Sequence, residues 1–251
     1  YRLANDLDFN GSSFTPLFAS GKPFNGTFDG NNKTIKNINL TAEDDVNKSY
    51  LSIFGYASKS KIKNVVFDNI KIDNDAKNHT GIHYVGIVVS KVSNNEFEME
   101  NITISNSSVT IKHNINKVTT NRNLYAGLVG GSLQGKLSKI TVSNSVLTVN
   151  QSGVNGIYNN GDIATSGTYV GGVVGLMEQD KGFSINQISV LNTEVNVNIN
   201  QDKKGNGSGL IYVGGIFGAN RSDRGSSELV SNAKISVTHV KHQDTEVSKM
   251  D

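Results

Sequence analysis

The sequence contains no cysteine, no tryptophan and only two prolines, Pro16 and Pro23. Without cysteine, the chain has neither disulfide bonds nor thiolate metal ligands, a composition that exported bacterial proteins share with many cytosolic ones. It also lacks long apolar runs, since none approaches the ~20 residues that cross a bilayer as a helix. We therefore expect no membrane insertion by this segment. Because the sequence begins at Tyr1 rather than Met, we expect a fragment or a processed form.

Charge of either sign is sparse. The chain has 24 basic and 22 acidic residues, which give a formal net charge of +2 over 251 residues. Its lysines are scattered, and the arginines form no local patch beyond the pair Arg221 and Arg224. A nucleic-acid-binding surface needs a concentrated positive field. The sequence therefore predicts no nucleic-acid partner.

Glycine is abundant, with 26 residues, and so are Asn, Ser, Thr, Val and Ile. These residue types favour strands and tight turns, whereas the strong helix formers Ala, Leu, Glu and Met are sparse. Composition therefore predicts an all-β fold. The length allows a substantial core, in one large domain or two ordinary ones.

One segment, built on a tyrosine followed by small and apolar residues, occurs five times at intervals of 34 to 44 residues. The copies are SYLSIFGYAS (49–58), HYVGIVVSKV (83–92), LYAGLVGGSL (124–133), TYVGGVVGLM (168–177) and IYVGGIFGAN (211–220). A second motif follows each copy and carries alternating apolar residues around one asparagine. With an earlier copy at 34–40, these asparagines are Asn37, Asn69, Asn106, Asn144, Asn192 and Asn232.

Alternation of β-branched residues on both sides of each asparagine predicts two short strands with a bend between them. With the tyrosine–glycine segment, this gives about three strands per repeat. An apolar residue stands two positions before every asparagine, including Val230 before Asn232. In the last four copies, apolar residues also stand three and five positions after the asparagine, and in the first two copies they follow it at a shorter distance. Polar stretches at 73–83 and 150–168 are expected to be loops.

Repeats of this length predict a parallel β-solenoid, in which each strand pairs with its equivalent in the next coil. We expect about six coils, roughly 25–30 Å long at the usual strand spacing. The asparagines would form an internal ladder, in which each side-chain amide bonds to its neighbour or to the backbone of the bend. Asn also tolerates the left-handed bend conformation better than most residues. The expected domain is single, 1–251, with a lead-in or cap at 1–40, coils at 41–240 and a tail at 241–251.

The glycines Gly171, Gly172 and Gly175 are also spaced like those of a phosphate-binding loop. Such a loop runs from a strand into a helix, however, and no helical start follows Gly175. The better interpretation is structural: these glycines, with Gly214, Gly215 and Gly218, mark places where neighbouring chain segments approach closely.

The repeated YVGGVVG and YAGLVGG cores, behind the lead-in YRLANDLDFNGSSFTPLF, resemble the GLUG-motif regions of bacterial surface and secreted proteins. These are best known from Gram-positive IgA-cleaving metallopeptidases. The resemblance covers nearly the whole chain. It implies a right-handed parallel β-helix, non-catalytic in itself and located outside the cell or on its surface. The copies YLSIFGY and YVGIVVS lack the doubled glycine, so the first coils should be less regular. No H-E-x-x-H zinc motif occurs.

The sequence offers two candidate metal sites. Asp6, Asp8, Asn10 and Gly11 match the first half of a calcium-binding loop, but Leu17 stands where the bidentate Glu is expected, and a strand followed by a turn is the favoured interpretation. His79 and His83 have the spacing of a helical metal pair in a loop-like context. With His113, His239 and His242 they are expected to be solvated. The sequence thus predicts neither a metal nor a cofactor.

A β-helix polysaccharide lyase or hydrolase is the enzymatic alternative, because such sites need converging acids. The candidate acids Asp68, Asp73, Asp75, Asp162 and Asp180 do not recur in adjacent repeats. We therefore expect no catalysis by this chain. The leading hypothesis is an extracellular or cell-surface module that binds a host protein or glycan, or acts as a stalk beside other domains of its parent chain. A second alternative is an accessory domain that positions substrate for a secreted zinc metallopeptidase.

Overall fold

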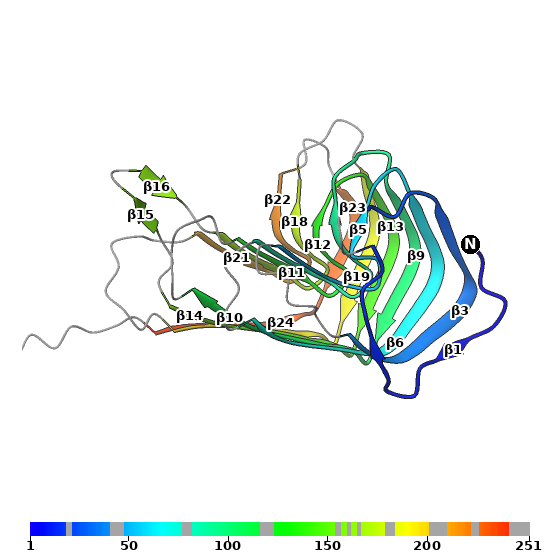
Figure 1. Cartoon of the computed structure of the whole chain (residues 1–251), viewed down its shortest axis with the longest axis horizontal. Helices are drawn as coiled ribbons and strands as arrows, with labels where there is room; N and C mark the ends of the chain where they lie inside the picture. Colours follow the sequence, from blue (N-terminus) through cyan, green and yellow to red (C-terminus); the bar gives the residue numbers. More distant parts are fainter. Residues whose placement is uncertain are drawn as a thin grey trace, which may run out of the picture.

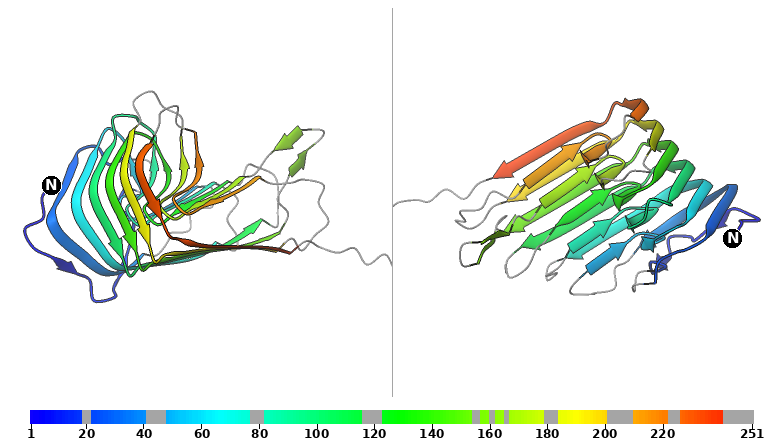
Figure 2. Two further views of the ribbon diagram at one scale, coloured as in Figure 1. Left: turned by 180° about the vertical axis from the view of Figure 1, so that it is seen from behind. Right: turned by 90° about the horizontal axis from the view of Figure 1, so that it is seen from above.

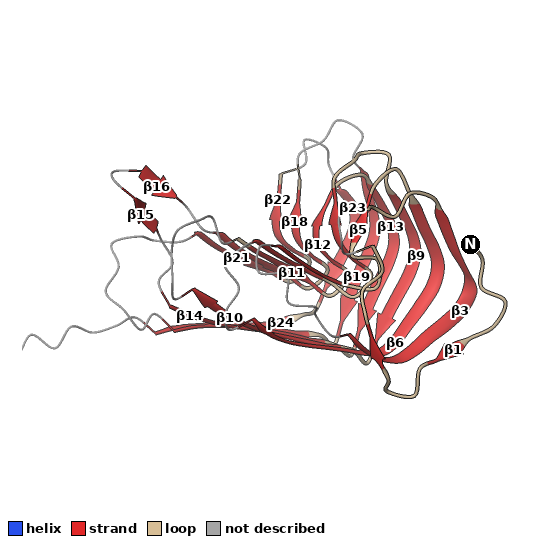
Figure 3. Cartoon of the chain, in the orientation of Figure 1, coloured by secondary structure: helices blue, strands red, loops and turns tan. Residues whose placement is uncertain are grey.

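The computed structural model describes residues 1–18, 22–40, 48–76, 82–115, 123–153, 157–159, 162–164, 167–178, 184–200, 210–221 and 226–240. All regular structure in these residues is β-strand, as Figure 3 shows. The same residues contain no helix that is long and apolar enough to cross a membrane. The all-β class predicted from composition is confirmed.

Three sheets make up most of the structure (Figure 1). The large sheet has 12 strands: β1 (Leu7–Asp8), β2 (Ser13–Phe14), β3 (Thr27–Leu40), β6 (Lys61–Ala76), β9 (Glu98–Ser105), β10 (Ser108–Ile115), β13 (Lys136–Ser143), β14 (Val146–Gly153), β19 (Ser184–Leu191), β20 (Glu194–Asn200), β23 (Ser226–Ser231) and β24 (Lys234–Val240). We call the second, five-stranded sheet the tyrosine sheet: β4 (Lys48–Leu51), β7 (Ile82–Val85), β11 (Leu124–Gly127), β17 (Gly167–Gly171) and β21 (Leu210–Gly214). The third, the glycine sheet, contains β5 (Tyr56–Ala57), β8 (Val89–Val92), β12 (Gly130–Leu133), β18 (Val174–Met177) and β22 (Phe217–Asn220).

Successive repeats pair in parallel within all three sheets, and they follow one another across the stack in sequence order (Figure 2). Tyr125, for example, is in register with Tyr84 on one side and with Tyr169 on the other. The parallel stacking predicted from the repeats is therefore confirmed. A full repeat contributes four strands rather than three, because each tyrosine–glycine segment divides into a strand of the tyrosine sheet and a strand of the glycine sheet.

The apolar core lies between the sheets and is built from in-register columns. Val109, Leu147 and Val195 pair side by side and are all fully buried. In the last repeat the equivalent residue, Ile235, is 45% exposed, because the described chain places no further strand beyond β24. Burial of β-branched side chains in such columns is the main stabilising contribution, at about 25 cal/mol per Å² of apolar surface removed from water.

The predicted loops are shorter than the sequence suggested. Strand β6 extends to Ala76 and β7 begins at Ile82, inside the predicted loop 73–83. Strand β14 reaches Gly153 within the predicted loop 150–168, which also contains an antiparallel hairpin of β15 (Ile157–Asn159) and β16 (Asp162–Ala164). From β3 onward, every connection of seven or more residues joins a strand of the large sheet to a strand of the tyrosine sheet.

The lead-in runs along one end of the stack (Figure 2). Strands β1 and β2 pair in parallel with β3, and single bridges join Leu17 to Phe54 and Phe24 to Ala57. The proposed tail at 241–251 lies outside the described residues. Of the two copies expected to be less regular, only the first is: Tyr56 is in register with Lys91, so its turn between the tyrosine and glycine sheets is one residue shorter. The second copy keeps the later spacing, with Val89 in register with Gly130.

Candidate functional site

Five of the six repeated asparagines form left-handed bends, and Asn232 in the last repeat does not. Asn37, Asn69, Asn106, Asn144 and Asn192 have φ angles between 47° and 59°, a region that Asn tolerates better than most residues. They pair in register along the stack. Asn69 Nδ2 donates to Asn37 Oδ1 (2.7 Å), and Asn37 Nδ2 donates to Asp8 Oδ1 (2.8 Å). The lead-in thus supplies a terminal partner to this column.

The expected internal location of the asparagine ladder is wrong, because these side chains lie on the outer surface. Asn106 Nδ2 bonds to Asp68 Oδ1 rather than to Asn69, and Asn232 Oδ1 accepts the backbone N–H of Asn192. The buried position is the next residue along. It is apolar in the first two repeats, at Ile38 and Ile70, and becomes a hydroxyl in the following three, at Ser107, Ser145 and Thr193.

These hydroxyls complete the bends. Ser107 Oγ donates to the carbonyl of Ser105 (2.7 Å) and accepts the N–H of Ile70 (3.0 Å) from the preceding repeat. Ser145 repeats both contacts. The shorter apolar offset of the first two copies involves no shift in register: Ile72 is in register with Val109, and the first two copies carry an apolar residue directly after the asparagine.

A second column of left-handed residues precedes the first and was missed from the sequence. It comprises Asn32, Asn64, Asn101, Lys139, Gln187 and Glu228, with φ between 54° and 58°. Asn101 Nδ2 donates to Asn64 Oδ1 (3.0 Å). Three of the six members are not asparagine, so residue type is a poor signal for this bend. In the last repeat the register also shifts: Ser231 rather than Val230 pairs with Val190, because this repeat is one residue shorter between β23 and β24.

We expect Asn144→Val to lower the free energy of unfolding by about 1–2 kcal/mol, because a β-branched residue pays the full steric cost of the left-handed conformation. Asn144→Gly should change stability far less, since glycine adopts this conformation freely. Urea denaturation measures both variants. Equal losses in the two would mean that the side chain, and not its backbone conformation, matters.

The six glycines singled out from the sequence all lie at close contacts, as expected. A Cβ atom at Gly175 would lie 2.5 Å from the backbone nitrogen of Ala126 and 2.7 Å from the carbonyl oxygen of Tyr169. The other five, Gly171, Gly172, Gly214, Gly215 and Gly218, would likewise place a Cβ closer than any real contact. The tyrosine and glycine sheets therefore meet backbone to backbone at these glycines. The segment around Gly175 is no phosphate loop, because strand β18 continues through Met177 instead of leading into a helix.

The tyrosines stack into one column. Ring centroids from Tyr50 through Tyr84, Tyr125 and Tyr169 to Tyr212 lie 4.9–5.4 Å apart, with planes within 16° of parallel. Burial raises the pKa of Tyr84 and of Tyr125 to about 12. Each hydroxyl still has a donor, Lys91 Nζ at 3.2 Å for Tyr84 and Asn123 Nδ2 at 2.9 Å for Tyr125.

The expectation of solvated histidines is wrong for two of the five. His83 and His113 are each 1% exposed, and their rings meet edge to face with centroids 4.9 Å apart. Beside them Thr168 Oγ1 donates to Gln151 Oε1 (2.6 Å), so polar contacts join the far part of the large sheet to the tyrosine sheet. His239 is exposed on β24, while His79 and His242 lie outside the described residues.

The calcium candidate forms a strand followed by a turn, in which Asn10 and Gly11 have positive φ. Asp8 Oδ1 accepts the backbone N–H of Asn10 (2.9 Å), and its pKa is lowered mainly by the hydrogen bond from Asn37. Asp6 Oδ1 accepts the N–H of Thr34 (2.8 Å). The carboxylates therefore hold the lead-in against β3. The described residues contain no group of three or more His, Asp or Glu side chains placed to hold a metal ion.

Outward side chains on the far half of the large sheet form regular polar columns. We call this surface the amide face. It is made by β10, β14, β20 and β24, and its columns are Thr110, Thr148, Asn196 and Ser236, then Lys112, Asn150, Asn198 and Thr238, then Ser152 and Asn200. Neighbouring columns are two residues apart on each strand, while neighbours within a column are about 4.8 Å apart, the strand spacing. Hydrogen-bonding groups thus repeat at fixed intervals in two directions.

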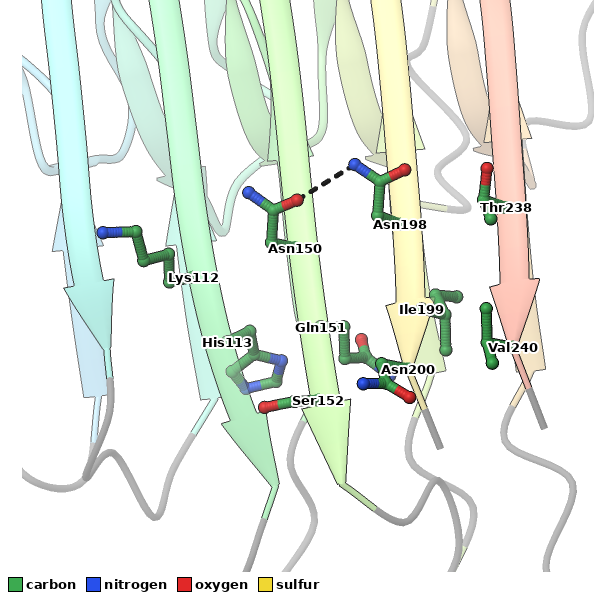
Figure 4. Close-up of a pocket in the computed structure, with 10 residues that line it drawn as sticks. All are labelled: Lys112, His113, Asn150, Gln151, Ser152, Asn198, Ile199, Asn200, Thr238 and Val240. Carbon is green, nitrogen blue, oxygen red and sulfur yellow. Dashed lines mark hydrogen bonds between the residues drawn. The ribbon is translucent and has the colours of Figure 1, made fainter. Parts of the chain in front are cut away.

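A hollow of about 520 Å³ lies on this part of the sheet (Figure 4). Asn198 Nδ2 donates to Asn150 Oδ1 (3.0 Å) at its upper edge, as the dashed line in Figure 4 shows. One such bond leaves each amide with further donor or acceptor capacity. The outward side chains around it carry amide, hydroxyl and amine groups, and Val240 adds an apolar one, but most of the surface that lines the hollow is carbon. The amide and hydroxyl groups can hydrogen-bond to hydroxyl-rich molecules.

The acids considered for catalysis do not converge in the described chain. Asp68 accepts hydrogen bonds from Ser105 Oγ (2.7 Å) and Asn106 Nδ2 (2.8 Å) and therefore belongs to the bend. Asp73 is exposed on β6, and Asp180 lies outside the described residues, as do the side chains of Asp75 and Asp162.

Comparison of the chain with family models, with curated proteins and with solved structures found no match.

Proposed function

We propose that the chain is a non-catalytic module of a bacterial extracellular or cell-surface protein, which binds a glycan through the amide face. In this proposal the three sheets form a right-handed parallel β-solenoid of about six coils behind its lead-in. The resemblance to GLUG-motif regions, drawn from the repeated tyrosine–glycine cores, supports both the fold and the location.

The observation that carries the proposal is the two-directional order of the amide face. Asn150 and Asn198 stand in register and bond to each other at the edge of the hollow. A glycan presents hydroxyl groups at regular intervals along its chain, and amides that both donate and accept match such groups. Parallel stacking holds the amides in place, so little side-chain ordering is required when the ligand binds.

The test is binding of the purified chain to immobilised neutral and acidic glycans. We expect Asn150→Ala combined with Asn198→Ala to weaken binding at least tenfold, because two amides of the hollow are lost. The matched control is Thr103→Ala with Thr141→Ala, an in-register outward pair on β9 and β13, outside the hollow, which should bind as the parent chain does.

Binding that survives loss of both asparagines would refute the amide face as the contact surface. Failure to retain any glycan would refute glycan adhesion and favour the role of a stalk. Release of soluble sugar products from the glycans would instead favour the lyase or hydrolase alternative.

A further inference from the structure

A second cavity lies at the opposite end of the molecule, between the lead-in and the first repeat. Its volume is about 420 Å³, and nothing in the proposed glycan binding uses it. Six of the ten phenylalanines of the chain line it: Phe9, Phe14, Phe18, Phe24, Phe28 and Phe54. Apart from Tyr1 and Arg2, its other lining residues are aliphatic and include Ile35, Ile38 and Ile53.

The aromatic walls are organised by ring contacts. The Phe24 ring lies 5.1 Å from that of Phe54, which in turn lies 5.1 Å from that of Phe28. Phe9 and Phe14 meet edge to face at 5.5 Å. Such arrangements leave ring faces and edges in defined positions, so that a further aromatic ring finds a preferred geometry.

One wall residue has a strained backbone. Phe18 has a φ angle of 61°, which is costly for a bulky side chain, and no glycine or asparagine takes its place. Strain of this kind is found where a side chain must be held for a function. Here it holds the Phe18 ring 5.3 Å from that of Phe24.

The mouth of the cavity is apolar, and the strands beside it are short. Leu7 and Leu17 line it and are 38% and 44% exposed. Strands β1 and β2, which contribute Leu7 and Phe14 to its lining, have two residues each. Short pairing of this kind opens at low free-energy cost, which gives a ligand a way in. Arg2, at the rim, already donates to Asn31 Oδ1 (2.6 Å), so the cavity offers no unengaged charge there.

We infer that this cavity binds a small, uncharged apolar molecule about the size of two aromatic rings. An apolar cavity of about 150 Å³ stays dry and accepts benzene, so a volume nearly three times larger accommodates two rings with room to adjust. The volume also falls within the usual range for ligand sites, about 300–1,000 Å³. The site is separate from the amide face and does not depend on the proposed function.

The uncharged fluorophore N-phenyl-1-naphthylamine tests the inference. We expect saturable binding to one site per chain, with a rise in fluorescence and a higher melting temperature, because the ligand binds only the folded state. Leu17→Trp and Leu7→Trp each place an indole in the mouth and should weaken binding at least tenfold. Circular dichroism checks that both variants keep their strands.

The control addresses the other apolar surface, at the end of the stack, where Ile235 and Val237 are 45% and 51% exposed. Ile235→Ser with Val237→Ser should leave probe binding unchanged. The inference fails if this double variant abolishes binding while the indole variants do not. It also fails if the parent chain shows no saturable binding. Glycan binding by all these variants should equal that of the parent chain, which separates failure of this site from failure of the amide face.

Discussion

Gly175→Ala should lower the free energy of unfolding by about 3 kcal/mol or more, the largest effect we expect from one added methyl group. The new Cβ would lie 2.5 Å from the backbone nitrogen of Ala126, 2.7 Å from the carbonyl oxygen of Tyr169 and 2.8 Å from that of Gly131. All three are backbone atoms of paired strands, so none can move without breaking sheet hydrogen bonds. In a thermal melt the midpoint should fall by on the order of 10 °C.

The matched control is Gly26→Ala. A Cβ at Gly26 would meet no atom within 4 Å, and its backbone conformation does not require glycine. Its melting temperature should stay within a degree or two of the parent value. If the two substitutions destabilise the chain equally, then the glycines of the repeats act through the flexibility of the unfolded chain and not through close packing.

Alkaline pH should destabilise the chain through the tyrosine column. The pKa of Tyr84 and of Tyr125 is raised from 10 to about 12 by burial, so the folded state holds these protons more tightly than the unfolded state does. The corresponding stabilisation is complete below about pH 10 and is lost as the pH rises towards about 12. At 1.36 kcal/mol per unit of pKa, each tyrosine contributes about 1–3 kcal/mol, and charging one ring also opposes charging of its stacked neighbour.

Denaturant unfolding at about pH 9 and about pH 11 measures this loss, and phenolate absorbance follows the titration. Tyr84→Phe with Tyr125→Phe should retain most of its stability between these two pH values, because phenylalanine cannot ionise. Tyr1→Phe is the control, since Tyr1 is 90% exposed. An unchanged pH dependence in the double variant would show that the loss arises elsewhere.

The sequence predicted the parallel stacking because the repeats place like residues at like positions. It failed at the bends for a physical reason. Strict alternation after Ile104 would turn Asn106 inward, but the left-handed conformation of Asn106 reverses the alternation. Ser105 and Asn106 therefore both face outward, and Ser107 is buried. Period-two reasoning cannot include such a reversal unless the bend conformation is known in advance.

The buried histidines were missed for a related reason. Polar flanking residues made His83 and His113 look like loop residues, yet β7 and β10 extend further than composition indicated, and both side chains turn inward. The amide face was foreseen only as a preference for Ser, Thr, Asn and Lys at outward positions, because the pairing of Asn150 with Asn198 depends on register. The Phe-lined cavity gave no signal, since its residues are scattered over the first 54 positions.

In-register stacking of equivalent segments is the central claim, and the lack of native cysteine allows one direct measurement of it. Thr103 is in register with Thr141, which is in register with Ser189. Neighbouring parallel strands lie about 4.8 Å apart, within reach of a disulfide, whereas strands two repeats apart lie beyond its limit of about 7 Å. Under mild oxidation, Thr103→Cys with Thr141→Cys should form an intramolecular disulfide in high yield, and Thr103→Cys with Ser189→Cys should not. Cross-linking of the second pair without the first would contradict the stacking of consecutive repeats.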